Sequence, residues 1–236
     1  MMKRLFILIL ILSIGNLHSQ TSAFNDLLQN HVNEKGDVDY KAFKKDEAKL
    51  DTYLASLEKT NTTSFASDNT EMAFWINVYN AYTIKIILSN YPLKSITNIK
   101  EDGKTAWKIP FVKAGGKTYT LDYVEHEILR KKFKDPRIHV GVNCASGSCP
   151  KLANFAFTAE NVDSALESLM KDFVNDTTRN KLKKNSVQIS EIFNWFKGDF
   201  TTNGSVIDYL NRYSNVAISK KAKIKYLPYD WSLNSK

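Results

Sequence analysis

The chain is poor in several residues and patterns that define protein classes. Its 9 glycines and 5 prolines in 236 residues are too few for a collagen-like chain, and we find no internal repeat or low-complexity tract. Its 2 cysteines and 4 histidines match no common zinc-binding spacing. No apolar run after residue 20 reaches about 18 residues, so the sequence predicts no membrane-spanning helix there.

What the chain does contain is typical of a globular protein with one sizeable core. Hydrophobic residues make up 43%, aromatic residues 12% and charged residues 25%, which excludes a disordered or coiled-coil protein. No segment resembles a linker, so we expect one domain. The formal charge is +8, and without residues 1–20, which contain Lys3 and Arg4, it is 31 − 25 = +6.

The N-terminus resembles a secretory signal peptide. Lys3 and Arg4 precede a mainly apolar region of ten residues from Leu5 to Ile14, and a polar segment up to Gln20 follows. We therefore predict a signal peptide at 1–20, a mature domain at 21–236, and a periplasmic or extracellular location without stable membrane insertion after cleavage.

Apolar periodicity predicts a mainly helical fold around one buried helix. Helices are expected near 24–31, 40–59, 122–133, 162–174, 191–196 and 206–213. The segment 70–90 has apolar residues on all sides, with Asp68 or Asn69 as its cap, and predicts the central helix.

Strands are expected at 107–112 and 117–120 as a β-hairpin, and at 138–142, 187–189 and 224–227. The strand at 138–142 would place His139, Gly141 and Asn143 on one face, with open space beside Gly141. The fold class is therefore α+β, a single domain with a buried central helix, several packing helices and a small, mainly antiparallel sheet.

The candidate chemistry lies between His126 and Pro150. Cys144 and Cys149 lie in a loop rich in small residues, and three interpretations remain open for them. The first interpretation is a structural disulfide between the two cysteines, which export permits. The second is that one of the two cysteines is a nucleophilic thiolate, activated by His139 or His126. The third interpretation is a redox dithiol or a metal site.

For a nucleophilic site, backbone amides of the loop are expected to stabilise an oxyanion, and an acid or an amide to orient the imidazole. The candidate residues for catalysis and for binding are listed here in turn: Cys144, Cys149, His139, Asn143 and Asp230 for catalysis; Asn77, Asn80, His126, Glu125 and Ser146 for binding. For Asn77 and Asn80 the favoured interpretation is that they satisfy backbone groups of loops that cross the central helix, and a place at the floor of the site is the alternative.

Four stretches resemble the family known as domain of unknown function 547. They are Phe74–Ala81, Asp135–His139 with Asn143–Ser146 and Ser148–Pro150, Ile192–Phe196 with Asp199–Phe200, and Tyr229–Asn234. The resemblance covers nearly all of the mature chain but brings no activity and no catalytic residue. Similar proteins sometimes carry glutaredoxin-like domains, which favours thiol redox chemistry. Papain-like and transglutaminase-like enzymes differ, because their nucleophilic Cys begins the central helix.

The sequence thus predicts an exported protein whose possible activity is thiol-dependent acyl transfer or hydrolysis. The alternatives are a disulfide-braced binding module, or a thiol-redox or metal-binding protein. We expect a small-molecule or peptide ligand, no cofactor and no nucleic-acid partner, since the basic clusters at 181–184 and 220–225 resemble solvated faces. The oligomeric state is not predicted.

Overall fold

A long hydrophobic helix runs through the middle of the molecule. In the computed structural model, which describes residues 21–236, helix α4 spans Asp68–Ser89 and nearly all of its residues from Met72 onward are buried. The predicted central helix is therefore confirmed, but its cap is Ser67, whose hydroxyl accepts the Thr70 amide. Ser67 has the extended backbone that a capping residue needs, whereas Asp68 and Asn69 already lie inside the helix.

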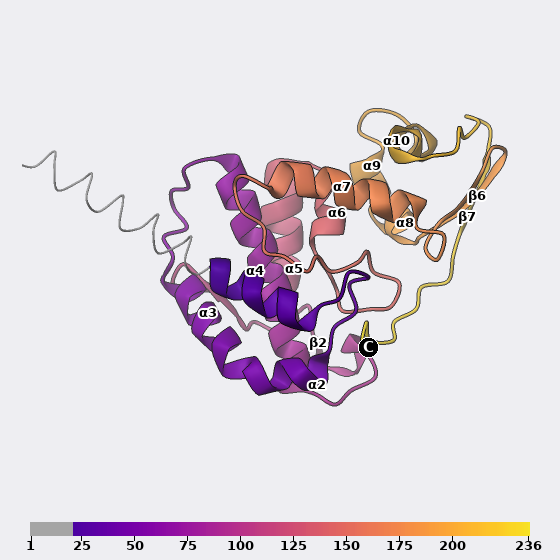
Figure 1. The fold of residues 1–236 in the computed structure, drawn as a ribbon. Helices are drawn as coiled ribbons and strands as arrows, with labels where there is room; N and C mark the ends of the chain where they lie inside the picture. The colour runs from indigo at the N-terminus through magenta and orange to yellow at the C-terminus, as the bar shows by residue number, and fades with distance from the viewer. Residues whose placement is uncertain (1–20) are drawn as a thin grey trace, which may run out of the picture.

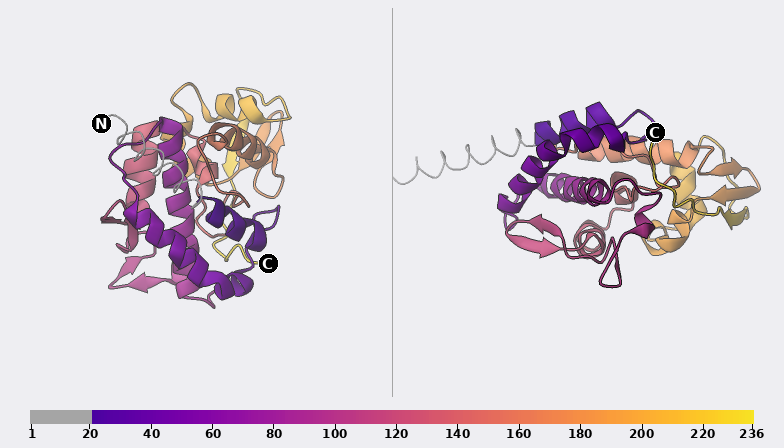
Figure 2. Two further views of the ribbon diagram at one scale, coloured as in Figure 1. Left: turned by 60° about the vertical axis from the view of Figure 1, so that its left-hand side comes forward. Right: turned by 90° about the horizontal axis from the view of Figure 1, so that it is seen from below.

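The other elements surround α4 (Figures 1 and 2). Residues 21–31 are helical, and α3 and η3 contact α4 directly. The remaining bounds are α2 Tyr40–Phe43, η1 Lys44–Asp46, α3 Glu47–Lys59, η2 Ile96–Asn98, α5 Leu121–Tyr123, η3 Val124–Phe133, α6 Ile138–Gly141, α7 Val162–Asn175, α8 Ile192–Trp195, α9 Lys197–Phe200 and α10 Val206–Tyr213. Seen from below in Figure 2, α4 lies between the indigo N-terminal helices and the pink η3.

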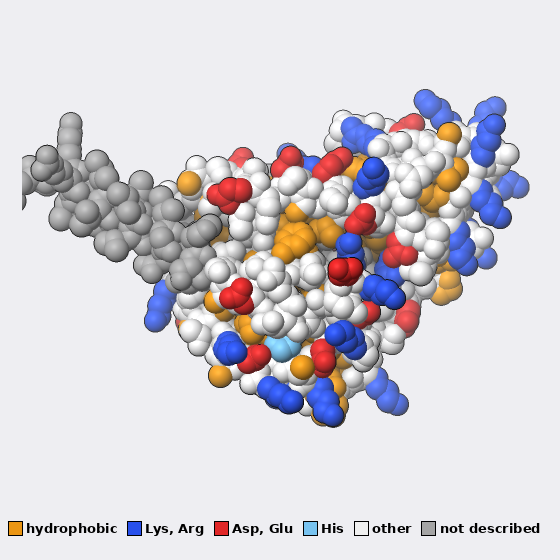
Figure 3. All heavy atoms as spheres, viewed as in Figure 1, with side chains coloured by type: hydrophobic (Ala, Val, Ile, Leu, Met, Phe, Trp, Pro, Cys, Tyr) orange, Lys and Arg blue, Asp and Glu red, His pale blue; other side chains and the backbone are white. Residues whose placement is uncertain are grey.

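The strands are short and form three small sheets among the described residues. Their bounds are β1 Lys100–Glu101, β2 Lys104–Thr105, β3 Val112–Ala114, β4 Lys117–Tyr119, β5 Lys181–Lys183, β6 Ser186–Ile189 and β7 Lys223–Tyr226. All pairs are antiparallel except β6 with β7, which is parallel. The protein is therefore an α+β domain, as predicted. Strand β5 was not expected, because its lysines were assigned to a solvated face; Figure 3 shows blue Lys and Arg side chains gathered over this end of the molecule.

The strand predicted at 138–142 is wrong, because Ile138–Gly141 form the short helix α6. The amide of Val140 donates to the carbonyl of Arg137, and that of Val142 to the carbonyl of Ile138. Five alternating residues are too few to separate a strand from a helical turn. Nor does Gly141 leave open space, since a Cβ there would lie 2.8 Å from Leu166 of α7. Gly141 instead permits close packing between α6 and α7.

The hairpin and the helix near 122–133 are present with different limits. The paired strands of the hairpin are only Val112–Ala114 and Lys117–Tyr119. The helix begins at Leu121, one residue earlier than predicted, with Thr120 as its cap. From Val124 it continues as the π-helical segment η3.

The predicted signal peptide lies outside the residues that the structure describes. Within residues 21–236, no helix combines the length and the apolar character needed to cross a bilayer.

Candidate functional site

The cysteine loop, residues 142–150, is held in place by buried asparagines. Asn80 of α4 donates to the carbonyl of Gly141 at 2.8 Å and accepts the amide of Asn143 at 2.9 Å. Asn143 in turn accepts the Ala145 amide and donates to the carbonyl of Pro150, both at 2.8 Å. These contacts give the loop its shape, and Asn143 does not line the pocket described below.

Asn77 acts in the same way one helical turn earlier. Its side chain donates to the carbonyl of Phe157 at 2.8 Å and accepts the amide of that residue at 2.9 Å. Both asparagines therefore satisfy backbone groups of loops that cross the central helix.

The amides of the loop are occupied by other protein groups. Those of Ala145, Gly147, Ser148 and Cys149 donate to Asn143 Oδ1, Ser232 O, Asp230 O and Ser146 O, respectively. Four amides of the predicted oxyanion site are therefore engaged by other protein groups, whereas the amide of Ser146 donates to Cys144. Two of the acceptors belong to the C-terminal segment 229–235, which packs along the loop.

Both cysteines are free thiols, so the predicted structural disulfide is not formed. The Cys144 amide donates to Cys149 Sγ at 3.2 Å. The hydroxyls of Ser146 and Tyr229 lie 3.1 and 3.3 Å from Cys144 Sγ. Hydrogen bonds from Cys149, Ser146 and Tyr229 together lower the pKa of Cys144 to about 6, although burial alone would raise it. Burial raises the pKa of Cys149 well above its ordinary value.

The two thiols therefore differ in protonation near neutral pH. Cys144 is mainly a thiolate and Cys149 remains a thiol that donates to it. Of the two, Cys144 is the less buried, and the thiolate is the nucleophilic form of cysteine. This asymmetry selects Cys144 as the candidate nucleophile.

His139 is buried and has a carboxylate partner that sequence reasoning missed. Its Nε2 lies 2.7 Å from Asp199 Oδ2, and its ring stacks on Phe196 with centroids 4.0 Å apart. Burial lowers the pKa of His139, so the imidazole is neutral at pH 7. Because an ionised Asp199 only accepts, Nε2 carries the proton and Nδ1 is the basic nitrogen.

Asp199 connects His139 to Arg130, whose Nε and Nη2 donate to its two oxygens at 2.7 and 3.0 Å. Burial alone would raise the pKa of Asp199, but the bonds from His139 and Arg130 hold it well below its usual range. Asp230, the acid predicted to orient a histidine, does not do so. It accepts the Ser232 amide at 2.9 Å in a turn of the C-terminal segment.

Glu125 is buried beside the thiols. The Tyr79 hydroxyl donates to its carboxyl group, but burial dominates and raises the pKa of Glu125 to about 7. His126 is half-buried; its Nδ1 accepts from Arg130 Nη1 at 3.2 Å, and burial lowers its pKa. Near pH 7, Glu125 can therefore hold or release a proton.

These groups meet in one pocket of ≈ 200 Å³, which we call the thiol pocket. Its lining residues are Tyr79, Trp107, Asp122, Glu125, His126, His139, Val142, Cys144, Cys149, Ile192, Trp195, Phe196, Tyr229 and Trp231. The predicted residues Cys144, Cys149, His139, His126 and Glu125 thus lie together. The predicted residues Asn143, Asp230, Asn77, Asn80 and Ser146 are not part of the lining.

Sequence reasoning missed the aromatic wall of this pocket. Trp231 contacts Trp107, Trp195 and Tyr229 with ring centroids 5.7, 5.8 and 4.6 Å apart. Trp195 is 47% exposed at the surface. The signal was present in the motifs that contain Trp195, Tyr229 and Trp231, but Trp107 was assigned to a strand.

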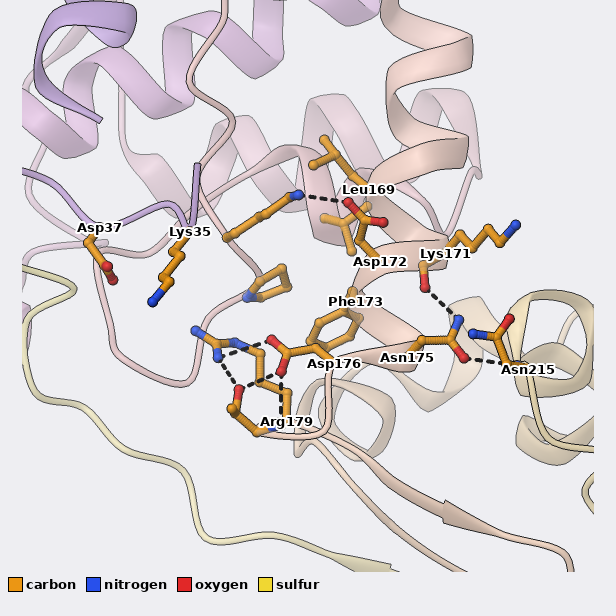
Figure 4. Close-up of a pocket in the computed structure, with 14 residues that line it drawn as sticks. Lys35, Asp37, Leu169, Lys171, Asp172, Phe173, Asn175, Asp176, Arg179 and Asn215 are labelled. Carbon is orange, nitrogen blue, oxygen red and sulfur yellow. Dashed lines mark hydrogen bonds and ion pairs between the residues drawn. The ribbon is translucent and has the colours of Figure 1, made fainter. Parts of the chain in front are cut away.

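A larger cleft of ≈ 620 Å³ lies along α7 and carries none of these groups (Figure 4). Charged side chains in this cleft form ion pairs with each other, including Lys151 with Asp172 and Arg179 with Asp176. Arg179 also donates to the carbonyls of Cys149 and Gly147 at 2.8 and 2.9 Å, so it supports the cysteine loop from behind. We assign the candidate chemistry to the smaller pocket, because it contains the perturbed thiol, the imidazole and the carboxyl group.

The predicted metal site has no support among residues 21–236, where no cluster of His, Cys, Asp and Glu is placed to hold an ion. The fold and the pocket define an α+β protein with two unlike thiols beside a buried His–Asp pair. Residues 63–174 match the family model described as Protein of unknown function, DUF547, which supports assignment of this segment to that family. The comparisons found no match among curated proteins or solved structures.

Proposed function

We propose that the protein is a thiol-dependent enzyme that catalyses acyl transfer or hydrolysis on a small substrate. The observation that carries the proposal is the pKa of Cys144, held near 6 by hydrogen-bond donors inside a pocket that also contains an acid–base group, Glu125. A thiolate that forms without a substrate, next to a carboxyl group with a pKa of about 7, is the combination that nucleophilic catalysis near neutral pH requires.

The reaction begins with attack of the Cys144 thiolate on an acyl carbon. The carbon–sulfur bond forms, the bond to the leaving group breaks, and protonated Glu125 gives its proton to the leaving group. Water then attacks the thioester and gives a proton back to Glu125, while the carbon–sulfur bond breaks and the thiolate is restored. In a transfer reaction, an amine or alcohol takes the place of water.

In this scheme His139 has a different role from the one expected from the sequence. A neutral imidazole has no second proton to give, so the acid of the first step is Glu125. His139, fixed by Asp199, presents Nδ1 as an acceptor and can hold the attacking water by a hydrogen bond while Glu125 takes the proton.

The test is covalent labelling of the folded protein with an activated acyl ester, followed by the pH dependence of turnover. Cys144→Ser should remove the label, whereas labelling of that variant at the wild-type rate would refute the assignment. The rate should rise with an apparent pKa near 6 and fall above about 7, giving a bell-shaped profile. Glu125→Gln should remove the alkaline limb, and Glu127→Gln, an exposed carboxylate of the same helix, should retain it.

The contact between the two thiols favours a second candidate, thiol–disulfide exchange. The Cys144 thiolate would attack a disulfide substrate and release one thiol, and Cys149 would then attack Cys144 Sγ and release the other. The two protein thiols are oxidised and the substrate disulfide is reduced. Cys149→Ala separates the two reactions, because it abolishes disulfide reduction and retains acylation of Cys144.

We also infer export, from residues 1–20 alone. Intact mass of the protein from its native host should show a chain that begins near Thr21.

A further inference from the structure

Most of the tryptophan residues of the protein line the thiol pocket. Three of the 4 tryptophans, Trp107, Trp195 and Trp231, line it, and Trp75 alone packs elsewhere, against Phe74 and Tyr119. Trp195 is 47% exposed, so part of its ring is accessible to a ligand. Three indole rings therefore line one small cavity, although Trp195 and Trp231 also stack on each other.

The charge of the pocket is opposite to that of the chain. The protein has a formal charge of +8, yet no Lys or Arg is among the described residues that line the pocket. Its lining includes the carboxyl groups of Asp122 and Glu125 and the acidic thiol of Cys144. Its two imidazoles are buried or half-buried and neutral at pH 7.

The nearest cations are already engaged or lie outside. Arg130 binds both oxygens of Asp199 and lies 4.9 Å from the centroid of the Phe196 ring. Lys108 acts on Asp122 only through its charge and does not line the pocket. The tryptophan faces are therefore left without a cation of the protein's own.

We infer that the thiol pocket selects substrates that carry a small organic cation, such as a primary or quaternary ammonium group. The faces of indole rings attract cations, most strongly when water is excluded, and a carboxyl group beside them adds charge complementarity. The volume of ≈ 200 Å³ is below the range of about 300–1,000 Å³ for drug-sized ligands, so it fits a compact headgroup. This inference rests on the proposed function, because it names the substrate class of the same site.

Binding is tested by calorimetry on the wild-type protein with choline and with 3,3-dimethylbutanol, its neutral isostere. We expect choline to bind at least about tenfold more tightly. Equal affinity for the two probes, or no binding of either, would overturn the inference.

Two variants locate the site. Trp195→Leu and Asp122→Asn should each weaken choline binding about three- to tenfold. Trp195 is partly exposed, so its replacement leaves no core cavity. The matched controls are Tyr123→Leu, an aromatic residue 48% exposed outside the pocket, and Glu127→Gln. Loss of affinity in the controls equal to that in the two variants would place the cation elsewhere.

Turnover separates the inference from the proposed function. Acetylthiocholine should be hydrolysed with a higher kcat/KM than 3,3-dimethylbutyl thioacetate, and Cys144→Ser should hydrolyse neither. Equal kcat/KM for both esters would support the proposed function and overturn the cation preference. Selective binding of choline without Cys144-dependent turnover would support the cation site and overturn the proposed function.

Discussion

The hydroxyl of Tyr229 provides the sharpest test of how the Cys144 thiolate is stabilised. It lies 3.3 Å from Cys144 Sγ and is contributed by a residue 85 positions later in the chain. Tyr229→Phe removes this donor while retaining the ring that packs on Trp195 and Trp231. The change therefore tests a single hydrogen bond.

The expected shift follows from the energy of such a bond. A hydrogen bond to a charged group contributes about 1.5–3 kcal/mol, and one pKa unit corresponds to about 1.4 kcal/mol. We expect the lower limit, because the hydrogen bonds from Cys149 and Ser146 to Cys144 remain in this variant. The pKa of Cys144 should rise from about 6 to about 7.

The assay is the rate of alkylation by iodoacetamide as a function of pH, with the alkylated residue assigned to Cys144 or Cys149 by fragment-ion mass spectrometry. The midpoint of the profile should move by about one unit in Tyr229→Phe. The plateau at high pH should rise about threefold, since a more basic thiolate is the better nucleophile.

The matched control is Tyr226→Phe, a nearby tyrosine that does not line the pocket. An unchanged midpoint in Tyr229→Phe, or an equal shift in the control, would refute the account of the thiolate given above.

Three further predictions concern stability and use urea denaturation. Glu125→Gln should stabilise the protein more at pH 8 than at pH 4, by up to about 3 kcal/mol. The carboxyl group of Glu125 keeps its proton up to about pH 7 in the folded protein but loses it near pH 4.5 in the unfolded chain, so the wild-type protein loses stability as pH rises between these values. An effect of the substitution that does not depend on pH would contradict this. Asp199→Asn should lower the free energy of unfolding by about 2–3 kcal/mol at pH 7 and by less near pH 2. A carboxylate with a lowered pKa stabilises the fold fully above its unfolded pKa, and this contribution is lost as pH falls towards its folded pKa. As a control, Asp163→Asn at an exposed position should change stability by under about 0.5 kcal/mol. Asn77→Leu should lower the free energy of unfolding by about 2–4 kcal/mol, because the carbonyl and the amide of Phe157 lose their buried partner. If the loss is smaller than that of Asn69→Ala, at an exposed position of the same helix, water has replaced the amide of Asn77.

Much of the fold could be predicted because it depends on local patterns. The 70–90 segment is apolar on all sides, and only a buried helix accommodates that pattern. The buried amides of Asn77 and Asn80 pointed to backbone partners for the same reason. By contrast, the alternation at 138–142 spans barely more than one helical turn, and the packing of Gly141 against α7 decided its structure.

The partners in the site were beyond the sequence because they come from distant segments. Asp199 meets His139 across 60 residues, and no spacing rule indicates such a pair. The oxyanion prediction depends on a related point: a loop rich in small residues offers free amides only where no other segment pairs with it. Here the C-terminal segment does so, through Ser232 and Asp230.

The same C-terminal segment has a consequence for the time at which the nucleophile becomes reactive. Synthesis proceeds from the N-terminus, so Cys144 emerges from the ribosome long before Tyr229 and the residues that pair with its loop. Until the C-terminal segment has been made, the Cys144 thiol lacks the hydrogen bond from Tyr229 and part of its burial, and it remains mostly protonated and unreactive. The order of translation therefore delays the full set of hydrogen-bond donors to Cys144 until the C-terminal segment has been made.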